Sequence, residues 1–338
     1  MRRLFILLAA LLAAAGPALA QTRPTLEAAR ARGSVICAVT NGLPGFSQAD
    51  PAGIMRGFDA DLCRAIAAVA LGDAARVTFR GTTVAQALTG LRERQVDVAA
   101  RVLTMTMSRD VVGGLMTTFV TTYDGQGFLV RRGGGIGALP DLAGRRICTP
   151  RASANADALR DLLRREGLDA TLVEVANLAE MRTAYAGGAC DLVSADTTGL
   201  IALRSSLAEP AAHELLPDII SREPLGPLVR EGDPHWRMLV FWTANALAEA
   251  EVQGITAANA EALRREGAPR QRMLLGGTPG IGAPLGLDDG WVLRAIAAVG
   301  NYGEMFERNL GRDSPLRLER GLNELYFRGG LIYPIPMR

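Results

Sequence analysis

Two charged residues stand at the ends of mainly uncharged segments of this chain. Arg109 closes the segment "RVLTMTMSR", and Asp196 closes the segment "CDLVSAD". A guanidinium presents a planar fork of donors that matches a carboxylate, so Arg109 could hold an acidic group, or it could lie on the surface and pair with Asp110. Asp196 could contact a ligand, or it could serve only as the N-cap of a helix over 199–207.

Residue types for other chemistries are sparse. The chain has two histidines, His213 and His235, and four cysteines. The cysteines lack C-x-x-C spacing and no histidine flanks one, so we expect no metal site. The segment "GGTPGIGAPLG" has no predicted strand before it and no Walker-type Gly-Lys-Ser after it, which indicates a loop. We therefore expect no cofactor.

The first 20 residues have the pattern of a secretory signal. A basic pair and an apolar run over 4–15 precede a small-residue cleavage pattern that ends at Ala20. The apolar run is shorter than the roughly 20 residues that a membrane-spanning helix needs. We expect an exported protein whose signal peptide, residues 1–20, is cleaved after Ala20.

The charge balance argues against one class of partner. Two of the 37 basic residues lie in the predicted signal, which leaves 35 basic residues against 35 acidic ones. A nucleic-acid-binding face needs a concentrated positive field, so we expect no nucleic-acid partner.

Alternating patterns predict two successive α/β units. The first unit has predicted strands over 34–40, 76–81 and 96–102 and predicted helices over 58–70 and 84–95. The second has predicted strands over 145–150, 170–176 and 190–196 and predicted helices over 154–167 and 178–188. Long amphipathic patterns over 236–251 and 291–310 predict further helices that return to the first lobe. We expect lobe 1 to comprise 21–124 and 226–338, lobe 2 to comprise 125–225, and the hinge to lie near 123–128 and 222–227.

The four cysteines are expected to form disulfides, because an even number is typical of exported proteins. Three pairings are possible. Cys37 and Cys63 lie in one predicted strand–helix unit, whereas Cys148 and Cys190 lie at the starts of two strands in the later unit. We favour the pairs Cys37–Cys63 and Cys148–Cys190, which keep each bond inside one lobe.

Seven longer motifs occur in order along the chain. They are "TNGLPGFS" (40–47), "GFDADLCRAIAA" (57–68), "TMSRD" (106–110), "YDGQGF" (123–128), "CDLVSADTTGLIALR" (190–204), "LPDIISREPLGPLVREGD" (216–233) and "AVGNYGEMFERN" (298–309). With these motifs the sequence resembles the periplasmic solute-binding subunit of general L-amino-acid ABC transporters. The resemblance implies the α/β fold of type II periplasmic-binding proteins, with two lobes and a two-strand hinge. It also implies that the protein traps a free amino acid and delivers it to an inner-membrane permease.

The resemblance assigns roles to residues at the expected cleft. Arg109 is expected to hold the ligand α-carboxylate, and Asp196, on the other lobe, to take the α-ammonium. Thr104 matches the family position that bonds the ligand head group. Because these contacts come from different lobes, the ligand would favour the closed form.

Other expected ligand-binding residues have alternatives that the sequence leaves open. Leu43 and Phe46 match the wall of the family pocket, but an apolar pair near a turn could equally belong to the core. The turn of Ala152 and Ser153 is expected to open a helix whose N–H groups meet the carboxylate. Arg101 could pair with a carboxylate side chain or lie on the surface.

Several positions depart from the family pattern. Val102, Leu103 and Met105 stand where relatives tend to have Asn, Thr and Trp, and "ASA" (152–154) replaces a Gly-Thr-Thr turn. Replacing glycine by Ala152 restricts φ. Because these changes remove polar groups and an aromatic ring, we expect a more apolar pocket, for a less polar amino acid or another small carboxylate.

Two other functions share this scaffold. A periplasmic enzyme such as a cyclohexadienyl dehydratase would need a general acid or base in the cleft, and both histidines are expected elsewhere. A ligand-sensing subunit for a receptor would use the same closed form. We expect a monomeric transport subunit without enzymatic activity, with an amino acid and the ABC permease as partners.

Overall fold

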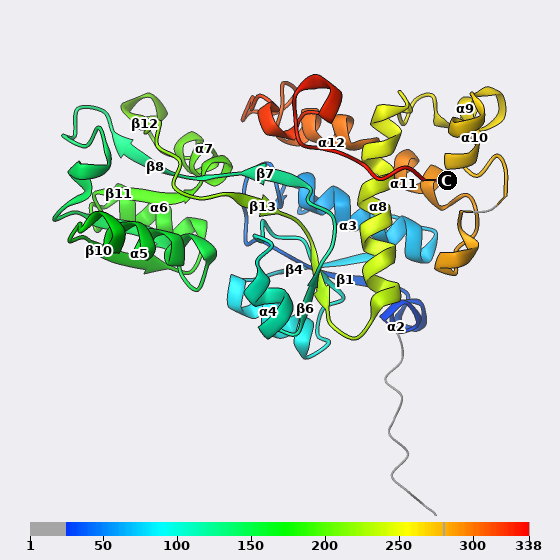
Figure 1. The fold of residues 1–338 in the computed structure, drawn as a ribbon, viewed down its shortest axis with the longest axis horizontal. Coiled ribbons are helices and arrows are strands. Elements are labelled where there is room, and N and C mark those ends of the chain that lie inside the picture. Colours follow the sequence, from blue (N-terminus) through cyan, green and yellow to red (C-terminus); the bar gives the residue numbers. More distant parts are fainter. Residues whose placement is uncertain (1–24, 280, 338) are drawn as a thin grey trace, which may run out of the picture.

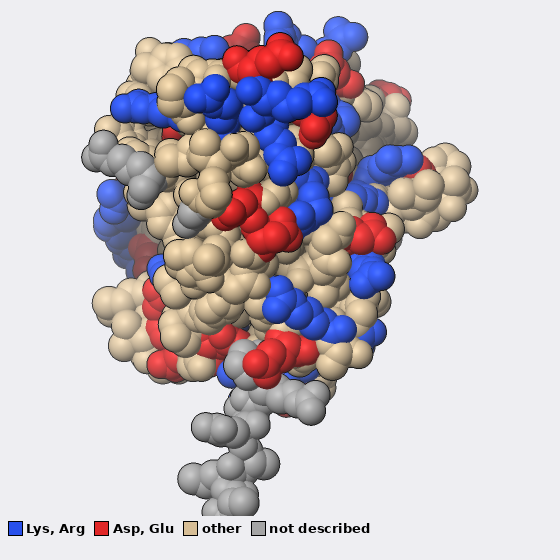
Figure 2. Space-filling view, turned by 90° about the vertical axis from the view of Figure 1, so that its right-hand side faces the viewer, with Lys and Arg blue, Asp and Glu red and all other residues tan. Residues whose placement is uncertain are grey.

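The computed structural model describes residues 25–279 and 281–337, which form two lobes joined by a pair of crossing strands (Figure 1). The predicted signal peptide and its cleavage after Ala20 lie outside the described residues. Within the described part, no helix has both the length and the apolar character to span a bilayer. On the face in Figure 2, basic and acidic side chains lie next to one another over the surface.

The sheet of the first lobe has the strand order β4-β1-β5-β14-β6. β1 (Val35–Val39) pairs in parallel with β4 (Val77–Gly81) and β5 (Val98–Ala99). β14 (Leu228–Arg230) pairs antiparallel with β5 and with β6 (Leu115–Thr117). Because β14 follows the second lobe in sequence, the chain returns to the first lobe after building the second.

The sheet of the second lobe has the order β10-β9-β11-β8-β12. β9 (Arg146–Pro150) pairs in parallel with β10 (Thr171–Val175) and β11 (Leu192–Asp196). β8 (Gln126–Arg131) pairs antiparallel with β11 and with β12 (His213–Leu215). All five residues of β11 are buried, as expected for a strand that helices cover on both faces.

Two antiparallel strands connect the lobes. β7 (Thr122–Asp124) pairs with β13 (Glu223–Leu225), and Tyr123 lies opposite Pro224. Figure 1 shows the two strands side by side between the lobes. The sequence placed the hinge at these two segments, and the two-strand hinge is confirmed.

Helices cover both faces of the first sheet. Cys37 and Val39 of β1 belong to a core shared with α3 (Phe58–Leu71), and Ala38 between them packs with α4 (Val84–Arg92) on the opposite face. The other helices of this lobe are α2 (Thr25–Arg32), α8 (Pro234–Val252), α9 (Ala260–Glu266), α10 (Pro269–Leu274), α11 (Trp291–Val299) and α12 (Tyr302–Asn309).

The amphipathic pattern over 291–310 forms two helices, where the sequence predicted one. Gly300 has a φ of 81°, which a helix interior does not allow. Asn301 then starts α12, because its side chain accepts a hydrogen bond from the backbone N of Glu304 at 2.9 Å.

The second lobe has three α-helices, and short elements complete the described chain. The helices are α5 (Ala154–Glu166), α6 (Leu178–Ala186) and α7 (Thr197–Ser205). The short elements are β2 (Gln48–Ala49), β3 (Met55–Arg56), η1 (Ser108–Val112), η2 (Leu139–Leu142), η3 (Pro210–Ala212), η4 (Ala283–Leu285), η5 (Gly321–Asn323) and η6 (Tyr326–Arg328).

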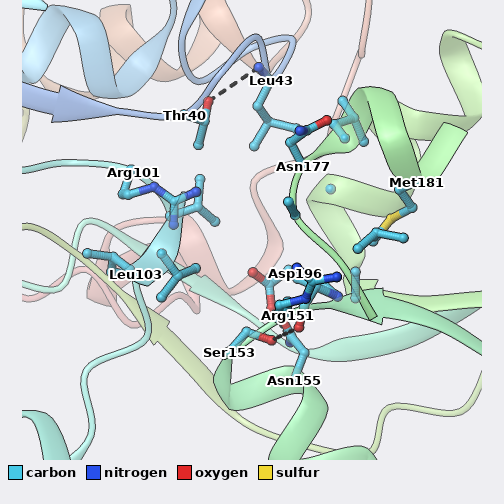
Figure 3. Close-up of a pocket in the computed structure, with 18 of the residues that line it drawn as sticks. Thr40, Leu43, Arg101, Leu103, Arg151, Ser153, Asn155, Asn177, Met181 and Asp196 are labelled. Carbon is cyan, nitrogen blue, oxygen red and sulfur yellow. Dashed lines mark hydrogen bonds between the residues drawn. The ribbon is translucent and has the colours of Figure 1, made fainter. Parts of the chain in front are cut away.

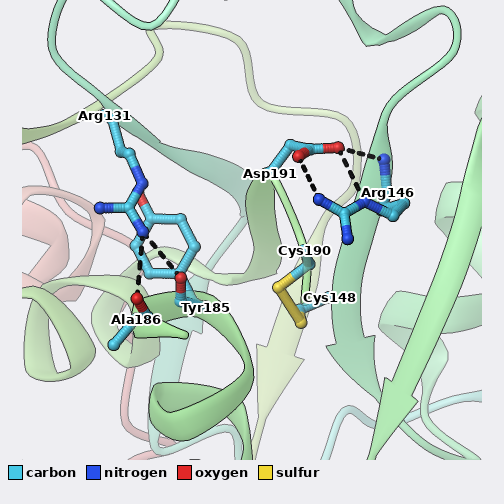
Figure 4. Close-up of a disulfide and its surroundings, with 7 residues drawn as sticks. All are labelled: Arg131, Arg146, Cys148, Tyr185, Ala186, Cys190 and Asp191. Carbon is cyan, nitrogen blue, oxygen red and sulfur yellow. Dashed lines mark hydrogen bonds and ion pairs between the residues drawn. A yellow bond between two sulfur atoms is a disulfide. The ribbon is translucent and has the colours of Figure 1, made fainter. Parts of the chain in front are cut away.

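Each lobe contains one disulfide. Cys37–Cys63 joins β1 to α3, and Cys148–Cys190 joins β9 to the residues before β11 (Figure 4). This is the pairing favoured from the sequence. Beside the second disulfide, Asp191 forms an ion pair with Arg146 at 2.7 Å.

Loss of the second disulfide should weaken the fold measurably. A Cys148→Ala/Cys190→Ala variant is expected to lose about 4 kcal/mol of unfolding free energy, because the bond restricts a loop of 42 residues in the unfolded chain. Denaturant unfolding followed by circular dichroism measures this loss. The corresponding Cys37/Cys63 variant, with a separation of 26 residues, should lose slightly less. An unchanged midpoint in the first variant would contradict the prediction.

Candidate ligand-binding site

A cavity lies between the lobes and is lined by side chains from both. The space between its walls measures about 920 Å³ and includes open solvent. Its lining residues follow the carboxyl ends of β1, β4 and β5 in the first lobe and of β9, β10 and β11 in the second. Ligands of α/β folds bind at such strand ends.

Arg109 reaches the cavity from η1. Its Nη1 donates a hydrogen bond to the carbonyl oxygen of Thr104. Asp110, the alternative partner, instead accepts hydrogen bonds from the backbone N and the hydroxyl of Thr117, at 2.8 and 3.0 Å. Arg109 therefore contributes a half-buried cation to the cavity wall.

Asp196 lines the cavity from the second lobe and is 9% exposed. It stands at the N-cap position of α7, but its side chain caps no backbone N–H. Asp124 of the hinge makes the capping hydrogen bond instead, because its Oδ2 accepts from the backbone N of Thr198 at 3.1 Å. The Asp196 carboxylate accepts instead from Nδ2 of Asn155 at 2.8 Å, beside which it lies in Figure 3.

The surroundings of Asp196 favour its neutral form. Burial raises the pKa of this carboxyl well above its ordinary value, and the neighbouring carboxylates of Asp124 and Glu223 raise it further. The hydrogen bond from Asn155 and the charge of Arg109 act in the opposite direction. A cation placed against Asp196 would therefore stabilise the carboxylate and release a proton.

Thr104 connects the cavity to the hinge. It lines the cavity, and its hydroxyl donates to Oε2 of Glu223 at 2.5 Å. A threonine hydroxyl has one donor and two acceptor positions. The Thr104 oxygen is therefore left as an acceptor, which suits an ammonium and not a carboxylate.

The turn at 152–154 leads into α5, as the sequence suggested. The Ser153 hydroxyl is occupied, since it donates to the carbonyl of Pro150 at 2.6 Å and accepts from the N of Ala156 at 3.2 Å. Ala154 and Asn155, the first two residues of α5, line the cavity. Ala152 is exposed and does not line the cavity; it lies in the turn before α5.

The backbone of Ala152 adopts a φ of 51°, which costs an L-residue about 1–2 kcal/mol. An Ala152→Gly variant is therefore expected to gain about 1 kcal/mol of unfolding free energy, which thermal unfolding measures. The matched control is Ala158→Gly inside α5, which should lose about 1 kcal/mol. Destabilisation by both changes would show that the turn is not strained.

Leu43 and Phe46 occupy different environments. Leu43 lines the cavity, and its backbone N donates to Oγ1 of Thr40 at 3.3 Å (Figure 3). Phe46 is 1% exposed and belongs to the core of the first lobe. Phe46 therefore has the core position that the sequence left open as an alternative.

The cavity wall combines apolar and charged side chains. Val102, Leu103 and Met181 form apolar wall, but Met105 does not line the cavity. Arginines contribute to the same lining, among them Arg101, which is 9% exposed and thus does not lie on the surface.

Several lining residues were missed from the sequence, among them Asn155 and Asn177. Asn177 also caps α6 by accepting from the N of Glu180 at 2.9 Å. An Asn that follows a predicted strand and precedes a helix is a signal that could have marked this position. No such signal marks Asn155, because its role depends on Asp196.

Both histidines have positions away from this cavity. Among the described residues, no cluster of three or more His, Cys, Asp or Glu is placed to hold a metal ion. His213 is buried against the hydroxyl of Tyr185, at 2.9 Å from its Nδ1, and His235 lies in α8. Neither histidine lines the cavity.

Comparison with known proteins identifies the family. Residues 35–258, which span both sheets, match the bacterial extracellular solute-binding proteins, family 3. The chain belongs to this family. Its relatives are therefore extracellular solute-binding proteins of family 3.

Two family 3 relatives match nearly the whole chain. The General L-amino acid-binding periplasmic protein AapJ of Rhizobium johnstonii is 41% identical over 98% of this chain and 97% of its own. The glutamate/glutamine/aspartate/asparagine-binding protein BztA of Rhodobacter capsulatus is 40% identical over the same shares. A solved ABC transporter/periplasmic binding protein of Brucella ovis with glutathione bound is 40% identical, with a TM-score of 0.90 over 94% of this chain and 100% of that chain.

Proposed function

We propose that this solute-binding protein captures a free amino acid between its lobes and delivers it to an inner-membrane ABC permease. The observation that carries the proposal is one cavity lined by a cation of the first lobe, Arg109, and a carboxyl group of the second, Asp196. An α-amino acid carries a carboxylate and an ammonium close together, so it can contact both. The names of the relatives AapJ and BztA support this class of ligand.

The remaining contacts follow from the donors and acceptors that the fold leaves available. Arg109 and the first backbone N–H groups of α5 would hold the α-carboxylate, because a helix N-terminus favours an anion. Asp196 and the hydroxyl oxygen of Thr104 would hold the α-ammonium. Leu43 would contact the side chain of the ligand.

Contacts from both lobes would couple binding to the hinge. A ligand shifts a conformational equilibrium by the difference between its affinities for the two states. The closed form, in which Arg109 and Asp196 both reach the ligand, would be favoured. This closed form would be the state that the permease recognises.

We further propose that the protein is exported to the periplasm after cleavage at Ala20, and acts as a monomer without catalysis. Asp196 would be engaged by the ammonium, and both histidines lie outside the cavity, so no free general base faces the ligand.

Mass spectrometry of small molecules released from freshly purified protein tests the proposed function. We expect an amino acid, or a small peptide with a free α-amino acid group, that is released unchanged after incubation. Calorimetry with the identified molecule would then give its affinity. A released molecule without paired carboxylate and ammonium groups, or one that the protein converts to a product, would contradict the proposal.

A further inference from the structure

Arg101 is a buried cation in the cavity wall, and no described residue forms a hydrogen bond with its side chain. It lines the cavity and is 9% exposed, and its Nε is buried with no hydrogen bond within the described structure. In Figure 3 its guanidinium projects into the cavity from the first-lobe side, across from Met181 of the second lobe. Arg109, in contrast, donates a hydrogen bond to the carbonyl oxygen of Thr104.

The acidic residue that stabilises Arg101 lies away from the cavity. Asp59 lies in the first turn of α3, is 5% exposed and has one carboxylate oxygen, Oδ2, without a partner in the described part of the chain. Burial raises the pKa of Asp59 to about 7, although the backbone N–H of Val102 and the charge of Arg101 lower it. Asp59 therefore neutralises Arg101 only in part near neutral pH.

Arg101 itself remains charged. Burial lowers its pKa to about 10, Asp59 raises it and the charge of Arg109 lowers it. Arg101 and Arg109 line the same cavity, from which one ligand could contact both.

The charges of the cavity do not balance for a neutral amino acid. Arg101, Arg109 and Arg151 line it, and Asp196 is the acidic residue among the described lining residues. A zwitterion would use Arg109 and Asp196 and would leave Arg101 enclosed beside it. Asp59 compensates this charge only in part. Enclosing an incompletely compensated charge is costly, and a second anionic group on the ligand would lower that cost.

We propose that Arg101 is a specificity-determining residue that binds a second anionic group of the ligand. The preferred ligands are then amino acids, or small peptides with an α-amino acid end, that carry a second carboxylate. This inference rests on the proposed function and names the substrate class of the same cavity. It replaces the expectation of a less polar ligand, which followed from Val102, Leu103 and Met105.

Calorimetry with L-glutamate and L-glutamine tests the inference, because the two have the same shape and differ in charge. The wild-type protein is expected to bind a compound with two carboxylates at least about tenfold more tightly than glutamine. This compound is glutamate or the larger glutathione. Arg101→Gln should weaken binding of the two-carboxylate compound about thirtyfold or more. Its affinity for glutamine should change about threefold or less, and Arg101→Lys should recover part of the loss.

Arg80→Gln is the matched control, because it removes an exposed arginine of the same lobe outside the cavity. It should leave both affinities unchanged, and circular dichroism checks that each variant folds.

The inference is overturned if the wild-type protein binds glutamate, glutathione and glutamine with equal affinity. This comparison needs no variant. An equal loss for charged and neutral ligands in Arg101→Gln would also overturn it, while the proposed function would stand. Failure to bind any amino acid or glutathione would contradict the proposed function itself.

Discussion

An Arg109→Ala variant is expected to lose about 2–5 kcal/mol of binding free energy for the amino acid that the wild-type protein binds. The reason is that truncation leaves the α-carboxylate enclosed without its counter-charge, which is the usual cost of breaking a buried charge pair. Isothermal calorimetry on the ligand-free protein measures the loss.

Arg109→Lys separates the effects of charge and geometry. Lysine keeps the positive charge but cannot form the planar two-bond contact with a carboxylate, so its affinity should fall between those of the wild-type and alanine proteins. Asp110→Asn is the neighbouring control, since Asp110 bonds Thr117 within the first lobe. Parental affinity in Arg109→Ala would remove this residue from the binding site.

An Asp196→Ala variant is expected to lose a similar amount, about 2–5 kcal/mol, because the α-ammonium would be enclosed without an anion. Asp196→Asn keeps the shape and the bond to Asn155 but removes the charge, and should show most of the same loss. An unchanged affinity in Asp196→Asn would mean that the carboxylate does not contact the ligand.

The pH dependence of binding gives an independent check on Asp196. In the ligand-free protein burial raises the pKa of this carboxyl, so the group is protonated below that raised pKa. The ligand ammonium requires the carboxylate, so binding releases a proton and the affinity falls as the pH falls through the raised pKa. Calorimetry in buffers of different ionisation enthalpy counts the released proton, which should be missing in Asp196→Asn.

Much of the architecture could be predicted because it depends on local patterns. Apolar runs at strand and helix periodicity indicated both α/β units, and the positions of Cys37, Cys63, Cys148 and Cys190 within those units indicated the disulfides. The boundary between α11 and α12 was missed, although Gly300 and Asn301 are residues that often end and start helices. The amphipathic pattern continues across this break and so concealed it.

The sequence by itself determined the two-lobed fold and which charged residues stand at the ends of strands, since periodicity and residue type are local properties. Only the tertiary structure decided which groups are available to a ligand. Asp124, 74 positions away from Thr198, caps α7 and thereby frees Asp196. Glu223, 119 positions from Thr104, takes the only donor of that hydroxyl. The cavity wall buries Arg101, and within residues 25–279 and 281–337 its Nε has no hydrogen bond. Neighbours along the chain do not specify such surroundings.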